Sequence, residues 1–470
     1  MNNITSLIYF IPELILLSVI LFLFITQDSP RRNLIVFKKA SVSFGILAAI
    51  IVNIFRWSDP SHGLFYNSIA IDPFTGLFSL VLLSAMFMLT LSDFVSPGSD
   101  PRNESALLHK MLILTASILL IESNNLIMLF LNSGLIGIAG IGLFQTDPIS
   151  QSKRQHIKSF ITYNLLSLSI LLFGFSLLYG LSGSLFFQSM SRGMTLISNH
   201  PFVSCVLLTL ILFGLGFHAG ILFYYSSFSK IGLKFNFSIS SITLFIPSIA
   251  YLGVLIKLVN LILIPDGLSN TVIGNQGLFI TILSLIVVTT ANFLYNRKRR
   301  LKELLVLAVL IHSGFILSGI SVLNPESISA SIYLTISTVI IFTGLYSAQK
   351  TCSQSDKTMR FFRIIFFLGL IGFPGTTGFT ARFLLFKSLF QSSIPAWITI
   401  LLLLNLLPIV FYFTSLILKS VRQNPGNKCT HLTVSQVLIP SIPGILSIGL
   451  GIFWEPFYRF INESLVYFKF

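Results

Sequence analysis

Seven ionisable side chains occur inside long apolar stretches of the chain, and their types could bind or transfer protons. They are Glu13, Glu122, His218, Lys257, His312, Arg382 and Lys387. An ionisable group in the hydrocarbon of a membrane is costly and marks an ion or proton pathway. Histidine titrates near neutral pH and a desolvated lysine can lose its proton, whereas arginine keeps its own. All of these residues except Glu13 are our candidate proton-path residues.

Most of these residues also have a structural interpretation. Glu13 follows a proline near a helix start, where a carboxylate complements the positive helix end. Glu122 falls in a turn, where it can be solvated or cap the next helix. Lys257 and Lys387 can extend their amines toward an interface, and a single histidine can be a hydrogen-bonded core residue. Arg382 is the hardest to explain in this way, because it follows a broken helix and stays charged.

Two apolar stretches are interrupted by glycine and proline. The stronger interruption is at 372–383 and the milder one at 214–220. The interrupting residues we single out are Gly214, Gly216, Pro374, Gly375 and Gly378. Such segments do not form continuous helices. Broken helices at membrane depth expose backbone groups and mark ion paths in transporters.

The composition sets the class of protein. The chain has 470 residues, of which 54% are hydrophobic and 10% charged, with a mean hydropathy of +0.88. Soluble domains are about 25% charged, so a soluble multidomain enzyme is excluded. The apolar runs are about 20 residues long, without the alternating segments of a β-barrel. We therefore predict an all-α integral membrane protein. Three separated cysteines and the absence of any clustered ligands predict no metal site.

Hydropathy predicts about fourteen transmembrane helices. They are 7–26, 41–55, 73–91, 105–121, 125–144, 159–181, 201–226, 237–264, 276–296, 303–323, 328–348, 361–388, 396–418 and 434–454. The net charge of +15 is explained by loops, because 23 of the 30 Lys and Arg residues follow odd-numbered helices. The loops after even-numbered helices hold only Arg56 and Arg192. The odd loops therefore face the cytoplasm or matrix, both termini face the opposite side, and nucleic-acid binding is not expected.

The two broken helices are the seventh and the twelfth, five helices apart. Two tandem five-helix units would give this spacing, and an odd number of helices per unit inverts the second unit relative to the first. We predict a three-helix segment at 1–100, a first repeat at 101–270 (helices 4–8), a second, inverted repeat at 271–430 (helices 9–13) and a last helix at 431–470.

Local motifs in order along the chain resemble the antiporter-like membrane subunits of respiratory complex I (NADH:ubiquinone oxidoreductase), and most of all subunit 2. The motifs are Pro12–Leu16, Asp72–Phe74, Ser123–Ile127, Lys302–Leu305 with Ile311–Phe315, and Gly372–Phe383. Each motif alone is weak, but together they extend over nearly the whole chain. The resemblance implies a glutamate in the fifth helix and lysines in the seventh, eighth and twelfth.

This sequence departs from the family at those four positions. The glutamate position falls on Gly134, the seventh-helix lysine on His218 and the twelfth-helix lysine on Arg382. For the eighth helix, matching by charge gives Lys257, whereas matching by spacing gives Ser248, which we prefer. Glycine and serine hold no charge, and arginine does not exchange its proton. The resemblance therefore implies a proton path that is degraded or rewired.

The resemblance also implies a role within a complex. The chain would be a non-redox subunit that couples NADH:quinone oxidoreduction to proton translocation, with no catalytic centre of its own. NADH, FMN, iron–sulfur clusters and ubiquinone would be bound by other chains, since no dinucleotide fingerprint, P-loop or cysteine cluster occurs here. Expected partners are subunit 4, the small quinone-side subunits and lipids. The alternative is a stand-alone or multisubunit cation/proton antiporter, against which the missing glutamate argues.

The composition also bears on location. The chain has 46 Phe and 3 Trp, and its strong use of Phe, Leu, Ile and Ser suggests a low-GC genome. No Arg-rich presequence precedes the first apolar run. We expect the mitochondrial inner membrane, with both termini on the intermembrane-space side, and an AT-rich bacterium or a plastid as alternatives.

Overall fold

The structure is a computed structural model. It describes residues 3–27, 32–57, 62–95, 103–146, 151–190, 201–221, 237–263, 270–295, 301–350, 357–422 and 433–466. Arg192, which the charge count singled out, lies outside the described residues.

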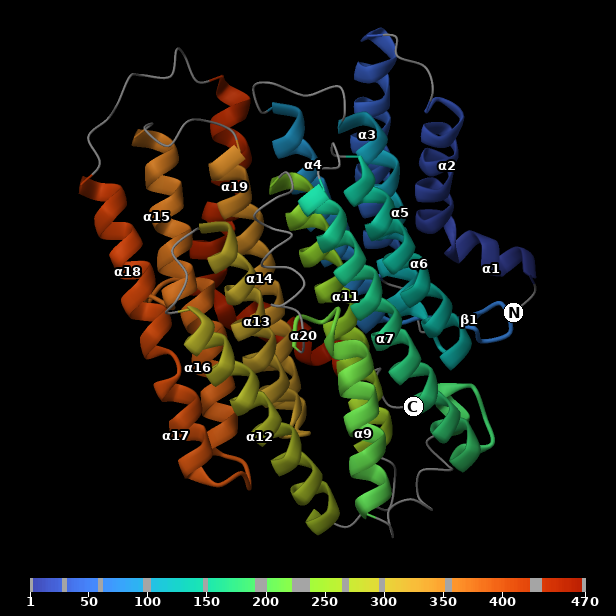
Figure 1. Ribbon diagram of the computed structural model, residues 1–470, viewed down its shortest axis with the longest axis vertical. Coiled ribbons are helices and arrows are strands. Elements are labelled where there is room, and N and C mark those ends of the chain that lie inside the picture. The colour runs from blue at the N-terminus through green and yellow to red at the C-terminus, as the bar shows by residue number, and fades with distance from the viewer. Residues whose placement is uncertain are drawn as a thin grey trace.

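The described chain is a bundle of helices that run mostly along one direction (Figure 1). The helices are α1 (Asn3–Tyr9), α2 (Ile11–Ile25), α3 (Arg32–Arg56), α4 (Pro73–Val95), α5 (Asn103–Glu122), α6 (Leu126–Gln145), α7 (Gln151–Ser182), α9 (Pro201–Gly216), α11 (Phe237–Leu263), α12 (Asn270–Tyr295), α13 (Leu301–Ile320), α14 (Pro325–Lys350), α15 (Lys357–Ile371), α16 (Thr377–Phe390), α17 (Ala396–Leu404), α18 (Leu407–Arg422), α19 (Val434–Ile452) and α20 (Trp454–Val466).

Within the described residues, each predicted transmembrane segment falls on one helix or on two consecutive helices, while the last part of the predicted segment 201–226 lies outside them. Among the described residues, nine helices are long and apolar enough to cross a membrane, and four shorter apolar helices accompany them. The predicted all-α membrane fold is therefore confirmed, while the count of fourteen spans stays a prediction. A small antiparallel hairpin, which the sequence did not predict, pairs β1 (His62–Leu64) with β2 (Ile69–Ile71).

The two predicted helix breaks are present. Helix α15 ends at Ile371 and α16 begins at Thr377, and between them Gly372 and Gly375 have φ angles of +82° and +90°. Such positive φ angles favour glycine, which lacks a Cβ. In Figure 1, α15 is drawn above α16, and the break lies between them. The milder break follows α9, whose last residue is Gly216, in a turn that contains Gly220 at φ +78°.

The packing of neighbouring helices recurs in the two halves of the chain. In the first half α5 packs against α6 and α11, and α7 packs against α9. In the second half α12 packs against α13 and α17, and α14 packs against α16. This recurrence agrees with two related five-helix units, whose boundaries stay a prediction.

Helix α14 is the centre of the bundle. Its buried residues extend from Ser327 to Ala348 with few interruptions, and it packs against α4, α13, α15, α16, α19 and α20. By contrast, α7 and the α17–α18 segment carry many exposed apolar residues. The polar groups described below therefore lie between helices, while the outer helices present an apolar surface.

The close approach of the two halves of the broken helix predicts an effect of Gly378→Ala. A Cβ at Gly378 would overlap the backbone carbonyl oxygen of Gly369, and backbone cannot move aside as a side chain can. We expect this overpacking to cost about 1–3 kcal/mol and to lower the thermal unfolding midpoint of the purified protein in detergent. Gly449→Ala is the matched control, because a Cβ there meets no atom within 4 Å. Equal midpoints for the two variants would contradict the tight contact.

Candidate functional site

The guanidinium of Arg382 lies at the break between α15 and α16. Its Nη2 donates to the carbonyl oxygen of Leu370 at 2.6 Å and to Nε2 of His312 at 3.1 Å. Leu370 is in the last turn of α15, where carbonyl groups have no partner within the helix. Arg382 therefore caps the broken helix and also binds a histidine of α13. Its Nε and Nη1 have no hydrogen-bond partner among the described residues.

The hydrogen bonds of His312 define its tautomer. Its Nδ1 lies 2.6 Å from the carbonyl oxygen of Ala308, and a carbonyl can only accept, so Nδ1 carries a hydrogen. Its Nε2 then accepts from Arg382. Protonation of Nε2 would place two cationic groups against each other and remove this bond. The pair therefore holds one fixed positive charge and one neutral imidazole.

A second polar group surrounds His218, in the turn that follows α9. Nε2 of His218 lies 2.7 Å from Oδ1 of Asn164 in α7, and the ring stacks on Tyr251 of α11 with centroids 4.9 Å apart. Helix α6 approaches this group through Gly137, where a Cβ would overlap the Asn164 amide. His218 is thus a buried histidine whose donor is satisfied by a neutral amide.

The two histidine groups are linked through one serine. Ser313 follows His312 in the chain, and its hydroxyl donates to the carbonyl oxygen of Gly220 at 2.6 Å. Gly220 is two residues after His218, in the turn that ends α9. This bond joins the turn that carries His218 to α13, whose His312 binds Arg382, and we refer to these three residues together as the line of His218, His312 and Arg382.

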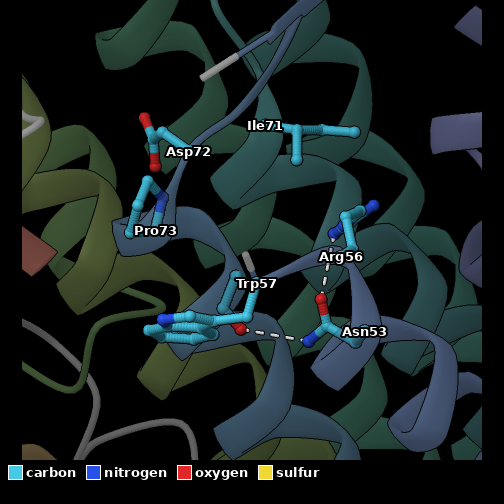
Figure 2. A pocket seen from close by; sticks show the side chains of 7 residues that line it. Asn53, Arg56, Trp57, Ile71, Asp72 and Pro73 are labelled. Atoms are coloured by element: carbon cyan, nitrogen blue, oxygen red, sulfur yellow. Dashed lines mark hydrogen bonds between the residues drawn. The ribbon is translucent and has the colours of Figure 1, made fainter. Parts of the chain in front are cut away.

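Glu122 lies in a different cluster, at the end of the bundle where the hairpin β1–β2 is found. Nη2 of Arg56 lies 3.0 Å from Oε1 of Glu122, and Nη1 lies 3.3 Å from Oε1 of Glu13. Ser79 also donates to Glu122, and Asn53 accepts from Arg56. Figure 2 shows Arg56 and Asn53 lining a cavity together with Asp72. Glu13 and Glu122 are therefore buried, ion-paired residues.

Lys257 lies next to this cluster. Its Nζ donates to the carbonyl oxygens of Ser123 at 3.0 Å and of Ile121 at 3.5 Å, and it lies 5.6 Å from the centroid of the Phe187 ring. Only 1% of Lys257 is exposed, so it does not extend toward an interface. Six residues separate it from Tyr251 on α11, or about 9 Å along the helix.

The remaining predicted residues lie apart from these groups. Gly134 is half-buried on α6, and a Cβ there would meet no atom within 4 Å. The hydroxyl of Ser248 donates to Phe245 O of its own helix at 2.8 Å, and Lys387 is exposed. Gly214 packs against Leu171 of α7. Pro374 and Gly375 form the break before α16, and Gly378 packs against Gly369.

Sequence reasoning missed three residues that the structure places in these groups, namely Arg56, Asn164 and Ser313. For Arg56 a signal existed, because it is one of two basic residues in the loops that the charge pattern leaves otherwise free of Lys and Arg. A basic residue that departs from this charge pattern is a candidate for a buried ion pair. Asparagine and serine inside apolar helices are common, and nothing in the sequence distinguishes these two.

A second buried ionic cluster lies at the opposite end of α4 and α5. Asp93 accepts from Lys110 at 2.7 Å and from the Tyr346 hydroxyl at 2.5 Å, and Lys350 lies 3.5 Å away. It joins α4, α5 and α14. Within the described ranges, no three His, Cys, Asp or Glu residues are arranged to hold a metal ion.

The comparison with protein families agrees with this architecture. Residues 123–407 match the family described as NADH:quinone oxidoreductase/Mrp antiporter, transmembrane. The chain belongs to this family. The match includes His218, His312 and Arg382, together with most of both predicted repeats.

Curated relatives are similar over nearly their full length. F(420)H(2) dehydrogenase subunit N of Methanosarcina mazei is 23% identical and covers 96% of this chain and 97% of its own. NADH-quinone oxidoreductase subunit N 2 of Sorangium cellulosum is 22% identical, covering 99% and 98%. Among solved structures, an archaeal membrane-bound sulfane sulfur reductase has a chain with TM-score 0.83 at 15% identity, covering 98% of both chains. Respiratory complex I from Thermus thermophilus has one with TM-score 0.77 at 15% identity, covering 95% and 98%.

The hydrogen bond between Asn164 and His218 predicts a non-additive pair of substitutions. Asn164→Leu leaves the buried imidazole donor unsatisfied, which costs about 1–3 kcal/mol. Replacing both partners with leucine removes the unsatisfied group, so the double variant should lose less than the sum of the single losses. Unfolding midpoints of Asn164→Leu, His218→Leu and the double variant measure this coupling. Strictly additive losses would mean that the bond contributes nothing.

Proposed function

We propose that this chain is the subunit 2 (subunit N) equivalent in the membrane arm of an NADH:quinone oxidoreductase. There it would take part in coupling quinone reduction to proton translocation. Family membership supports this, as do curated relatives that are named subunit N and match nearly end to end. The chain would contribute no redox centre, and NADH, FMN, iron–sulfur clusters and ubiquinone would belong to other subunits. Its partners would be subunit 4, the small quinone-side subunits and lipids.

The observation that carries the mechanistic part of the proposal is the fixed environment of Arg382. The resemblance places a lysine of the family's proton path at this position. A buried lysine can exchange a proton, whereas an arginine essentially cannot. Here the guanidinium is also held by Leu370 O and by neutral His312. Arg382 would therefore act as a permanent positive charge, and the chain's own path would be rewired around it.

The groups next to Arg382 support a path that conducts protons poorly at its centre. His218 is bonded to a neutral amide, and Ser313 links its turn to α13 through a backbone carbonyl. No carboxylate among the described residues contacts His218 or Arg382. In our proposal protons move along this line through histidines and water alone, because the charged glutamate–lysine axis of the family is absent.

The location follows from the same proposal. A coupling subunit belongs in an energy-transducing membrane, with both termini on the positive side. The matched relatives named above are archaeal and bacterial. The Phe-rich composition favours one such membrane, the mitochondrial inner membrane. Finding the gene in an organellar genome would test this more specific location.

Replacing the fixed charge with lysine tests the mechanism. We expect Arg382→Lys, in the assembled complex in its own membrane, to raise the number of protons translocated per electron, because a buried ammonium can exchange. The measurement is the proton-to-electron ratio in closed vesicles. Arg459→Lys is the matched control, since Arg459 is exposed and pairs with exposed Glu455. An unchanged ratio with normal assembly would refute Arg382 as the limiting site.

Purification of the untagged complex distinguishes the two candidate functions. The proposed subunit should co-purify with quinone reductase activity. Co-purification with antiporter subunits alone, and sodium-driven proton movement without electron transfer, would instead assign the chain to the cation/proton antiporter branch that the family also contains.

A further inference from the structure

The charges of the Glu13–Arg56–Glu122 cluster do not balance. Two carboxylates lie against one guanidinium, and Glu13 and Glu122 are 3% and 0% exposed. Each carboxylate uses Oε1 to accept from Arg56. Both Oε2 atoms are buried without a hydrogen-bond partner among the described residues. A buried charge without a partner is costly, so two such oxygens in one cluster point to a missing ligand.

The surrounding charged groups do not supply the missing partner. Lys257 interacts electrostatically with Glu122, but its Nζ donates to backbone carbonyls. Asp72 accepts from the backbone N of Thr75 at 2.7 Å and adds a further negative charge. The ring of His62 lies against the ring of Tyr9, with centroids 4.4 Å apart and the ring planes tilted by 48°. With all carboxylates and amines ionised, the group of Glu13, Glu122, Asp72, Arg56 and Lys257 has one excess negative charge.

The two glutamates meet at one guanidinium. Glu13 accepts from Nη1 of Arg56 at 3.3 Å and Glu122 from Nη2 at 3.0 Å, and the two carboxyl groups interact with each other. If one carboxyl carries a proton, its O–H donates to the oxygen of the other. One proton therefore supplies both unpartnered oxygens and removes the excess charge.

We propose that Glu13 and Glu122 form a proton-binding site that holds one shared proton, separate from the line of His218, His312 and Arg382. In the uptake step an O–H bond of a hydronium ion breaks, an O–H bond forms on Oε2 of one glutamate, and water leaves. A cavity lined by Asn53, Arg56 and Asp72 adjoins the pair at Arg56, which binds both glutamates (Figure 2). Arg56 keeps the second carboxylate ionised, so the pair exchanges one proton and not two.

This inference does not depend on the proposed function. It requires only that the helices α2, α3 and α5 meet as described. If the chain is a complex I subunit, the site would hold a proton near the face of the membrane where both termini are predicted to lie. A failed test of the proton-binding site would leave subunit identity and the role of Arg382 unchanged.

Infrared difference spectroscopy of the intact complex tests the proposal during a pH titration at constant sodium. A shared proton gives a carboxylic acid C=O band that is present near neutral pH and disappears on alkalinisation. We expect Glu122→Gln to abolish this band. The glutamine amide can donate to Glu13 as the protonated carboxyl does, so the variant should fold. Glu455→Gln is the control, because Glu455 is exposed on α20 and should leave the band unchanged.

Two outcomes would overturn the proposal. A band that persists in both Glu122→Gln and Glu13→Gln would belong to another carboxyl group. A band that appears only when sodium is removed at constant pH would mean that the two oxygens bind a cation in place of a proton. If Glu122→Gln fails to assemble, Glu13→Gln carries the test, because its amide can donate to Glu122 in the same way.

Discussion

Three buried cations of this bundle bind backbone carbonyl groups where helices end. A helix that ends inside a membrane leaves carbonyl groups that water cannot reach, and each unsatisfied group is costly. Arg382 donates to Leu370 at the end of α15, Lys257 donates to Ser123 just after α5, and Arg56 donates to Tyr9 at the end of α1. In each case a positive charge lies where the helix dipole is negative. The broken helices and the buried charges are therefore two parts of one arrangement.

This arrangement explains why an arginine is tolerated where the family's lysine would exchange protons. A guanidinium carries five N–H donors in a fixed plane, so Arg382 can cap α15 and bind His312 with a single nitrogen. Its other two nitrogens stay available, among the described contacts, for water or another acceptor. Gly372 makes room for this group, because a Cβ there would lie 2.6 Å from Nη1. The glycine at the break thus leaves the space that the arginine side chain needs, and the positive charge of Arg382 has a structural role in capping α15.

The sequence was sufficient for the apolar segments, for both breaks and for several of the buried charged residues, although Lys387 is exposed and Arg56 and Asp93 were not singled out. The sequence did not identify the partners of these charged residues. Arg56 pairs with Glu13 and Glu122, which are 43 and 66 residues away, and no periodicity links such positions. The sequence also did not show which face of α6 packs against its neighbours, because α6 is apolar on nearly every side. Gly134 and Gly137 therefore look alike in the sequence, although only Gly137 packs against Asn164.

The first three predicted membrane segments contribute residues to buried ionic clusters that also include residues of the two predicted repeats. Helix α4 carries Asp93 at one end and Ser79 nearer the other, and these residues join two buried ionic clusters near opposite faces of the bundle. The cluster with Asp93 has a lysine on each of α5 and α14 and a tyrosine hydroxyl, so its carboxylate is fully paired. The cluster with Glu122 has more carboxylates than its cations neutralise. Because α2 and α3 supply Glu13 and Arg56 while α5 supplies Glu122, the one place in the described chain with paired carboxylates lies where the N-terminal segment meets the first predicted repeat.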